Sequence, residues 1–382
     1  MANYDYEIIN GRKIRVRPKE TVSEIDKNGY FRRQPNHFTT PFGDGENDLK
    51  AEGNKRYRLV WAKLCHWSNR AAIVRELEGL EDQISVNMVE HAPHEKNLGW
   101  EYVYNENNID PVLGDQFPSE AYYRADDDYQ GRTTVPALID TTTGKVVNND
   151  YNWLTTYFEV NFRPWHKKGA PELYPVELRE EIDKMNLWLF DNINNAVYRS
   201  SFSRSNEGHF DGVNTFYAAM DRLEKRLETN RFLFGDYVTD SDIRLYVTLA
   251  RLDIRYTAQL GETKRPLYTY KNLWGYAKEL WEIPAFAHHT DFAAIIRQGG
   301  SEGEEDGFRA STHYDLALPK IDWDAQWKVS TERAYLSSDP THPIYLGNNR
   351  RFDIDPTWYD LGAESPKKEE KETPPSCGCC CG

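Results

Sequence analysis

The 382-residue sequence has no long apolar run, because no stretch approaches the ~20 consecutive apolar residues that a membrane-spanning helix requires. Residues 1–13 also lack the apolar segment of a signal peptide. We therefore expect a cytoplasmic protein that has no membrane partner.

Basic residues are scarce relative to acidic ones: Lys and Arg total 47, Asp and Glu total 61, and the net charge is −14. Binding to a phosphate backbone needs clustered cations, so the composition argues against a nucleic-acid partner. The length predicts about two domains. Aromatic residues make up 13% of the chain, which predicts either a large aromatic core or an aromatic-lined pocket.

Cysteine is nearly absent from the body of the chain. Cys65 is the one cysteine before the last six residues, which hold Cys377, Cys379, Cys380 and Cys381. Because Cys65 has no partner within the body, the sequence excludes a disulfide framework and suits a reducing compartment.

The first half of the chain predicts a small α/β domain. Residues 1–50 are polar and rich in Gly, Asn and Pro, so we expect an irregular extension there. A domain over 51–165 follows. We expect its strands at 56–64, 84–89, 135–140 and 145–147 and a loop-like connection at 90–130. We expect its helices at 65–79 and from 149 or 150 to about 158. This order of elements is typical of a thioredoxin-like domain.

The second half predicts helices. Apolar residues recur every three or four positions in the segments 175–195, 211–229, 239–261, 268–281 and 285–297. The predicted fold class is therefore an α/β thioredoxin-like N-terminal domain followed by an all-α C-terminal domain over 171–335. For residues 336–382 we expect an extended segment with a disordered, Cys-rich tail.

Cys65 is the candidate catalytic residue, because it lies where a predicted strand meets the start of a helix. The unpaired N–H groups and the positive dipole end there stabilise a thiolate, which is a nucleophile toward disulfides and thioethers. A buried, inert cysteine fits the same position equally well. His66 is adjacent and either adds positive charge or faces solvent.

Two further elements are predicted to face this thiol. Pro136 opens a strand, and in a thioredoxin-like fold it is cis and leaves the backbone of Val135 free to bind a peptide-like ligand; an ordinary loop proline is the alternative. Asp150 opens the next helix, where N–H groups suit a carboxylate and the Asp suits an amino group. Plain N-capping also explains this second position.

Six motifs between residues 55 and 297 carry a family resemblance. The first joins Arg56-Tyr-Arg-Leu-Val to Cys65-His-Trp-Ser-Asn-Arg70, and the others are Leu77-Glu-Gly-Leu-Glu81, Gly99-Trp-Glu-Tyr102, Thr134-Val-Pro-Ala-Leu138, Asn195-Ala-Val-Tyr198 and Thr239-Asp-Ser-Asp-Ile-Arg-Leu245. They resemble motifs of the glutathione transferases, and more closely those of the xi class, the glutathionyl-hydroquinone reductases. The resemblance implies an enzyme and a homodimer. It also implies a small aromatic electrophile and no nucleotide cofactor.

The resemblance further implies a cysteine-type transferase that reduces rather than conjugates. Cys65 would attack the thioether of a glutathionyl-quinol and release the hydroquinone, and a second thiol would resolve the mixed disulfide. It implies that the thiol cosubstrate is bound by Trp67, Trp100, Arg132, Val135, Pro136, Asp150 and Tyr151, and that the electrophile pocket holds Tyr198 and His66.

The chain departs from the family pattern at three places. His66 stands where the family has Pro, Asp150-Tyr151 stands where it has Glu-Ser, and Gln298-Gly-Gly300 stands where it has His-Tyr-Tyr. The cosubstrate is therefore glutathione or another low-molecular-weight thiol, and Tyr314 is the candidate substitute for the missing pocket tyrosine.

The tail cysteines, Cys377, Cys379, Cys380 and Cys381, form a cluster of the kind that binds soft metals such as Cu(I) or Zn(II). A tail thiol could instead resolve the mixed disulfide on Cys65, or the tail could do neither. The alternative to an enzyme is a non-catalytic module of the transferase fold with a metal-binding tail.

Overall fold

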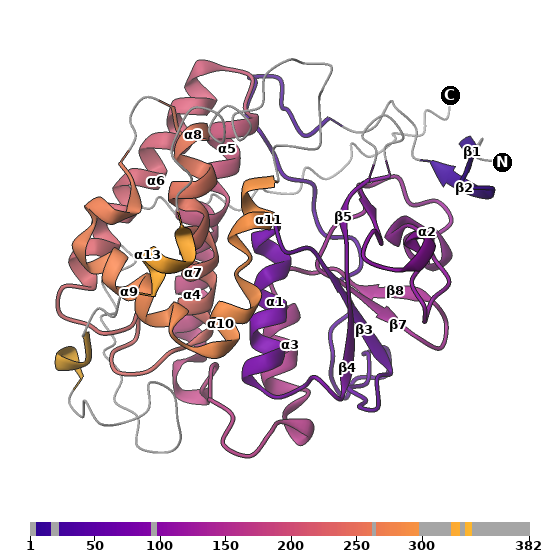
Figure 1. Cartoon of the computed structure of the whole chain (residues 1–382), viewed down its shortest axis with the longest axis horizontal. Coiled ribbons are helices and arrows are strands. Elements are labelled where there is room, and N and C mark those ends of the chain that lie inside the picture. The colour runs from indigo at the N-terminus through magenta and orange to yellow at the C-terminus, as the bar shows by residue number, and fades with distance from the viewer. Residues whose placement is uncertain are drawn as a thin grey trace, which may run out of the picture.

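The computed structural model describes residues 5–16, 23–92, 98–261, 265–297, 322–328 and 333–337. Within these ranges a four-stranded sheet with helices on both faces lies beside a group of packed helices (Figure 1). We call the first part the sheet unit and the second the helical unit. No helix in the described ranges is both long and apolar enough to cross a membrane.

The sheet has the strand order β4-β3-β7-β8. The strands are β3 (Tyr57–Trp61), β4 (Ile84–Met88), β7 (Ala137–Asp140) and β8 (Lys145–Asn148). β3 pairs parallel with β4, with Tyr57 opposite Ile84, and antiparallel with β7, with Leu59 opposite Leu138. All residues of β3 are buried, as a central strand covered on both faces requires. The four predicted strands and the thioredoxin-like order are confirmed.

The two faces of the sheet bury different sets of residues. Leu59 of β3 packs in one cluster with α1 (His66–Leu77) and α3 (Leu154–Val160), whereas its neighbour Val60 packs in another with α2 (Pro118–Ala125). Alternate residues of a strand point to opposite faces, so α1 and α3 cover one face and α2 covers the other (Figure 1). The predicted end of the first helix is confirmed: α1 stops before Gly79, whose φ of +74° favours glycine.

The prediction of a loop-like connection over 90–130 is wrong, because this segment contains α2, the short strands β5 (Glu90–His91) and β6 (Trp100–Glu101), and a 3-10 turn at Glu106–Asn108. Caps rather than apolar periodicity define α2. Pro118 occupies its first position, where a missing N–H costs nothing. The Glu120 carboxylate accepts from the backbone N–H groups of Gln116 and Phe117 at 2.8 and 3.2 Å.

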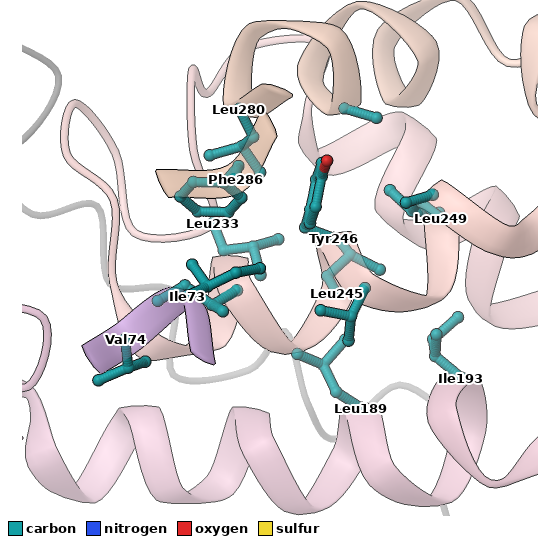
Figure 2. Packing of buried hydrophobic residues seen from close by; sticks show 14 of the residues in the cluster. Ile73, Val74, Leu189, Ile193, Leu233, Leu245, Tyr246, Leu249, Leu280 and Phe286 are labelled. Atoms are coloured by element: carbon teal, nitrogen blue, oxygen red, sulfur yellow. The ribbon is translucent and has the colours of Figure 1, made fainter. Parts of the chain in front are cut away.

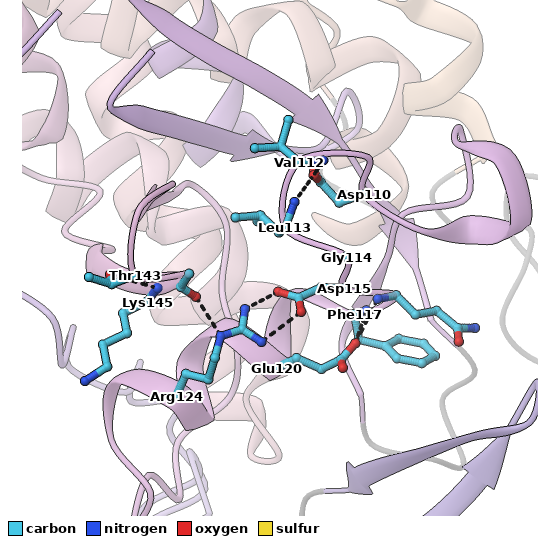
Figure 3. A network of polar contacts seen from close by, with 12 residues as sticks. Asp110, Val112, Leu113, Gly114, Asp115, Phe117, Glu120, Arg124, Thr143 and Lys145 are labelled. Carbon is cyan, nitrogen blue, oxygen red and sulfur yellow. Dashed lines mark hydrogen bonds and ion pairs between the residues drawn. The ribbon is translucent and has the colours of Figure 1, made fainter. Parts of the chain in front are cut away.

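A polar network ties α2 to the rest of the sheet unit (Figure 3). Arg124, in the last turn of α2, forms an ion pair with Asp115 and donates from Nε to the Gly144 carbonyl oxygen at 2.9 Å. Gly144 lies in the turn between β7 and β8, so this arginine links the helix to the hairpin. Asp110 accepts from the backbone N–H groups of Val112 and Leu113 and holds the loop that precedes α2.

The prediction of an irregular extension over residues 1–50 is also wrong in part. β1 (Asp5–Ile9) and β2 (Arg12–Val16) form an antiparallel hairpin. Its turn is Asn10-Gly11, both with positive φ, and this dipeptide is the strongest short hairpin signal in a sequence. Residues 23–42, which we call the strap, have almost no regular structure and cross from the helical unit to the sheet unit.

The helical unit contains α4 (Arg179–Leu189), α5 (Ala196–Phe202), α6 (Asn206–Arg226), α7 (Asp240–Arg251), α8 (Thr257–Gln259), α9 (Lys271–Trp281), α10 (Pro284–His289), α11 (Phe292–Arg297) and α13 (Trp323–Trp327). Further 3-10 turns in the described ranges are Arg163–Trp165, which follows α3, and Val176–Leu178, Leu267–Thr269 and Arg333–Leu336 in the helical unit. Two of the predicted helices continue through π turns, Phe190–Asn194 after α4 and Leu252–Tyr256 after α7. α6 begins five residues before the predicted start, since Ser205 accepts from the N–H of Gly208 and caps it.

The two units share one apolar interior. Every residue of α7 is buried, because this helix is enclosed by α1, α4 and α9. Figure 2 shows Ile73 of α1 pointing toward Leu233 and Leu245, and these residues belong to the same apolar cluster as Val74 and Tyr246. The units therefore pack as parts of one core rather than through a polar interface.

Arg251, the last residue of α7, makes the central polar link between the units. It is fully buried and donates to the carbonyl oxygens of Lys63 and Leu64, each at 3.0 Å. It also donates to Val247 O at 2.8 Å and to the Asn69 side chain at 3.3 Å. The helical unit thus fixes the loop that leads directly into Cys65.

We expect Arg251→Leu to lower the free energy of unfolding by about 3 kcal/mol, because it leaves the buried Leu64 carbonyl and the partly buried Lys63 carbonyl without donors. Urea unfolding monitored by circular dichroism measures this. The matched control is Arg265→Leu, which removes an exposed ion pair with Asp221 and is expected to cost less than about 1 kcal/mol. Equal losses in the two variants would contradict the link.

Candidate active site

A cavity of about 400 Å³ lies where the strap, the sheet unit and α5 meet. Seven residues predicted for the site line it: Cys65, Trp67, Trp100, Arg132, Val135, Tyr151 and Tyr198. The other lining residues are Glu24, Ile25, Phe31, Arg33, Gln34, Asn36, Leu64, His91, Thr134, Phe202 and Arg204. The cavity therefore joins the predicted thiol-binding and electrophile residues in one space.

Cys65 lies at the wall of this cavity as the residue that precedes α1, and its side chain is 8% exposed. The thiol contacts the Val135 carbonyl oxygen, with 3.7 Å between Sγ and O. Ser68 holds the loop in place by accepting from the Ala62 N–H and donating to the Ala62 carbonyl oxygen. The sulfur is thus held at a helix start and faces a cavity, as the catalytic interpretation of Cys65 requires.

The Val135–Pro136 peptide bond is cis, as predicted. Val135 lines the cavity opposite the thiol, whereas Pro136 is buried behind it and is not part of the wall. The backbone of Val135 therefore forms the edge that faces Cys65, and Pro136 supports that edge from within.

Asp150 and Tyr151 have different positions. Asp150 does not line the cavity, and its Oδ1 accepts from the Asn36 side chain at 2.8 Å and from the Asn152 N–H at 3.0 Å. Tyr151 lines the cavity and packs on Trp67, with ring centres 4.7 Å apart. The predicted helix start at residue 149 or 150 is wrong, since Asp150 starts a turn and α3 begins only at Leu154.

Trp100 and Arg132 lie on the sheet side of the cavity. Trp100 stacks on His91, with ring centres 4.5 Å apart and planes at 17°. Arg132 forms an ion pair with Glu24 of the strap at 2.9 Å and exchanges two hydrogen bonds between its backbone and the Gln34 side chain. The strap therefore positions this arginine.

The strap supplies six lining residues that the sequence did not predict: Glu24, Ile25, Phe31, Arg33, Gln34 and Asn36. Phe38 holds the strap to the sheet unit through paired bonds with Asn149, since its N–H donates to Asn149 Oδ1 at 3.0 Å and its carbonyl accepts the Asn149 N–H. The Phe31 N–H donates to Ser203 Oγ at 3.0 Å, which holds the strap to the helical unit. No periodic pattern marks the strap in the sequence, so its part in the site was not predictable from local signals.

The prediction that His66 lies in the electrophile pocket, with a positive charge or facing solvent, is wrong. His66 is 1% exposed and does not line the cavity, because its side chain points toward Thr248 and Tyr256 of the helical unit. Its Nδ1 lies 3.1 Å from the Tyr256 hydroxyl and 3.3 Å from that of Thr248. Burial lowers the pKa of His66 well below the ordinary value, and the nearby Arg251 guanidinium lowers it further, so the ring is neutral at neutral pH.

Tyr198 lies between the cavity and His66, with 5.2 Å between the ring centres of the two residues. Burial raises the pKa of Tyr198 above the ordinary tyrosine value, and the charge of a Cys65 thiolate raises it further. The Tyr198 hydroxyl is hydrogen-bonded to that of Tyr256. It therefore keeps its proton at neutral pH and can donate it within the cavity.

Several predicted features lie outside the described residues: Tyr314, residues 298–300 and the tail cysteines Cys377, Cys379, Cys380 and Cys381. Within the described ranges, no group of three or more His, Cys, Asp or Glu side chains is arranged to hold a metal ion. The described part of the chain thus offers a cavity with a thiol rather than a metal centre.

Comparison with known proteins gives relatives over most of the chain. Residues 197–279 match the family described as "Glutathione S-transferase, C-terminal domain". The chain is 34% identical over 280 residues to glutathione S-transferase omega-like 2 of Schizosaccharomyces pombe, covering 70% of this chain and 88% of the relative. It is 32% identical over 240 residues to the glutathionyl-hydroquinone reductase YqjG of Escherichia coli, covering 63% and 73%.

The chain also resembles solved structures of glutathione transferases. The xi glutathione transferase of Phanerochaete chrysosporium is 32% identical, with a TM-score of 0.65, over 72% of this chain and 88% of that one. The glutathione-bound structure of Escherichia coli YqjG is 29% identical, with a TM-score of 0.65, over 80% and 97%. The likeness therefore extends over nearly the whole length of these relatives.

We expect Asn149→Ala to make alkylation of Cys65 by iodoacetamide about fivefold faster. The variant removes the hydrogen bond from the Phe38 N–H, and a loss of ~1 kcal/mol makes opening of the strap about fivefold more frequent. Peptide mass spectrometry follows Cys65 separately from the other cysteines. The control is Asn28→Ala, since Asn28 is an exposed strap residue. An unchanged rate in Asn149→Ala would show that the strap does not limit access to the thiol.

Proposed function

The chain belongs to the xi class of glutathione transferases, the glutathionyl-hydroquinone reductases, and from this premise we propose that it is a glutathione-dependent reductase of aromatic thioethers. The observation that carries the proposal is the position of the Cys65 sulfur, at the start of α1 and on the wall of a cavity opposite the Val135 carbonyl. This placement supports a nucleophilic thiolate rather than an inert core cysteine.

The proposed reaction has two steps. The Cys65 thiolate attacks the sulfur of a glutathionyl-hydroquinone, an S–S bond forms, and the bond from sulfur to the ring carbon breaks. The ring carbon keeps the electron pair and takes a proton, so the hydroquinone is released and Cys65 carries a glutathionyl group. The thiolate of a second glutathione then attacks this disulfide and gives glutathione disulfide and free Cys65.

Glutathione is the thiol that the relatives support, since YqjG has a glutathione-bound structure. In the proposed arrangement the peptide-like backbone of glutathione lies along Val135, with Trp100 and Arg132 beside it. Tyr151 stands where the family has Ser, and its hydroxyl keeps a hydrogen-bond donor on this wall. Pro136 supports the Val135 edge, and Asp150 supports the strap through Asn36, so both residues act on the cosubstrate indirectly.

Tyr198 is the proposed proton donor to the ring carbon. It lines the cavity that holds the thiol, and its raised pKa keeps the hydroxyl protonated. Tyr256 and His66 stand behind it as hydrogen-bonded neighbours. The three side chains lead from the cavity into the interior, so Tyr198 is oriented by groups that solvent does not reach.

A cytoplasmic location and a homodimer stay predictions from the sequence. Two features favour the alternative of a non-catalytic module: the Asp150-Tyr151 pair, whose Tyr151 lines the cavity that holds the thiol, and the tail cysteines, which lie outside the described residues. We therefore treat the enzyme as the one function that the described residues support.

The first test is turnover of a glutathionyl-menadiol substrate by the full chain with glutathione, followed by chromatography of the released quinol. We expect Cys65→Ser to abolish release, because the hydroxyl cannot form the mixed disulfide. Intact-mass measurement of the wild type treated with substrate alone is expected to show one added glutathionyl group at Cys65. Turnover by Cys65→Ser equal to the wild type would overturn the mechanism.

The second test separates the two steps. We expect Tyr198→Phe to slow single-turnover release of the quinol by about 100-fold, the usual contribution of a general acid. Resolution of a preformed disulfide between Cys65 and glutathione should be unchanged, because that step protonates no carbon. The control is Tyr268→Phe, an exposed tyrosine. Equal slowing of both steps would mean that Tyr198 acts only through the structure of the site.

A further inference from the structure

The strap places one cation inside the aromatic part of the cavity. The Arg33 guanidinium carbon lies 4.5 Å from the ring centre of Tyr198 and 4.7 Å from that of Trp67. The ring of Phe31 is 5.5 Å away and that of Tyr151 is 6.0 Å away. These ring faces attract the cation but supply no negative charge.

The guanidinium is fixed in direction but not neutralised. Its Nε donates to Asn195 Oδ1 at 2.9 Å, which ties it to the turn that precedes α5. Its Nη2 is buried and has no hydrogen-bond partner among the described residues. No carboxylate in the described ranges forms an ion pair with it, whereas Arg132, on the sheet side of the same cavity, is paired with Glu24.

A buried guanidinium nitrogen without a partner is costly, and an anionic oxygen is its strongest partner. We propose that Arg33 binds an anionic oxygen on the aromatic half of the substrate, so that the enzyme selects electrophiles that carry a phenolate or a carboxylate. This inference rests on the proposed function and adds a specificity-determining residue to it.

The position of Arg33 favours the aromatic half over the thiol half. Asn195, its partner, lies three residues before Tyr198, so the guanidinium belongs to the α5 side of the cavity. The thiol edge, Val135, belongs to the sheet unit. Phe31 and Phe202 pack on each other on the Arg33 side, with ring centres 5.4 Å apart, and give the cavity an apolar wall there, against which an aromatic ring can pack. Arg204 also reaches the cavity, but from the exposed rim, where water solvates it.

The test compares two thioethers that differ by one charge, S-phenacylglutathione and S-(4-carboxyphenacyl)glutathione. We expect Arg33→Gln to lower kcat/KM for the carboxylated substrate by roughly 10- to 100-fold and to change the neutral substrate by less than about threefold, because a charge-assisted hydrogen bond is lost only with the first. Arg33→Lys is expected to keep part of the preference. The control is Arg32→Gln, since Arg32 is an exposed strap residue that pairs with Asp26.

The possible outcomes are distinct. Equal losses for both substrates would overturn the proposal and leave Arg33 a structural role. A higher KM for glutathione in the resolving step, with the substrate preference unchanged, would assign the anion to the thiol and would also overturn it. If the wild type turns over neither substrate, the glutathionyl-menadiol assay decides whether the proposed function fails, because the phenacyl thioethers join sulfur to a CH2 carbon rather than to a ring carbon. The Kd values of both thioethers for Cys65→Ser and for Cys65→Ser with Arg33→Gln then decide the role of Arg33: equal Kd values for the carboxylated compound overturn it.

Discussion

One buried arginine links the two units of this protein at the nucleophile. Arg251 extends from the helical unit and donates to the backbone of residues 63 and 64, immediately before Cys65. The geometry of the nucleophile therefore depends on a residue almost two hundred positions away, as well as on Ser68 of the helix that follows it. Since the same core continues through both units, neither unit presents a complete site by itself.

The strap adds the second constraint, because it closes the cavity and decides which charges face it. Glu24 neutralises Arg132 on the sheet side, whereas Arg33 keeps an unpartnered nitrogen on the aromatic side. The cavity thus has a neutral edge beside the Val135 backbone and a positive, aromatic end beside Tyr198. Such a division suits a substrate with a peptide-like half and a flat half.

Local patterns were sufficient to predict the centre of the fold and of the site. The strand before Cys65, the helix after it and the cis Val135–Pro136 bond follow from periodicity, a glycine stop and the order of elements. The strap could not be predicted, because its hydrogen bonds to the two units reach residues 89 to 175 positions away and its backbone has no period. His66 was misplaced for a related reason: its burial depends on packing against α7, which no local pattern reports.

The docking of the strap also has a consequence for the order in which the protein matures. Phe31 and Arg33 leave the ribosome early, but their partners Ser203 and Asn195 are synthesised 172 and 162 residues later. The sheet unit is complete before those partners exist, and it already holds the later part of the strap through Phe38 and Asn149. The Phe31 and Arg33 end of the strap gains its hydrogen bonds to the helical unit only after residues 195–203 have been added, so the α5 side of the cavity is the last to form.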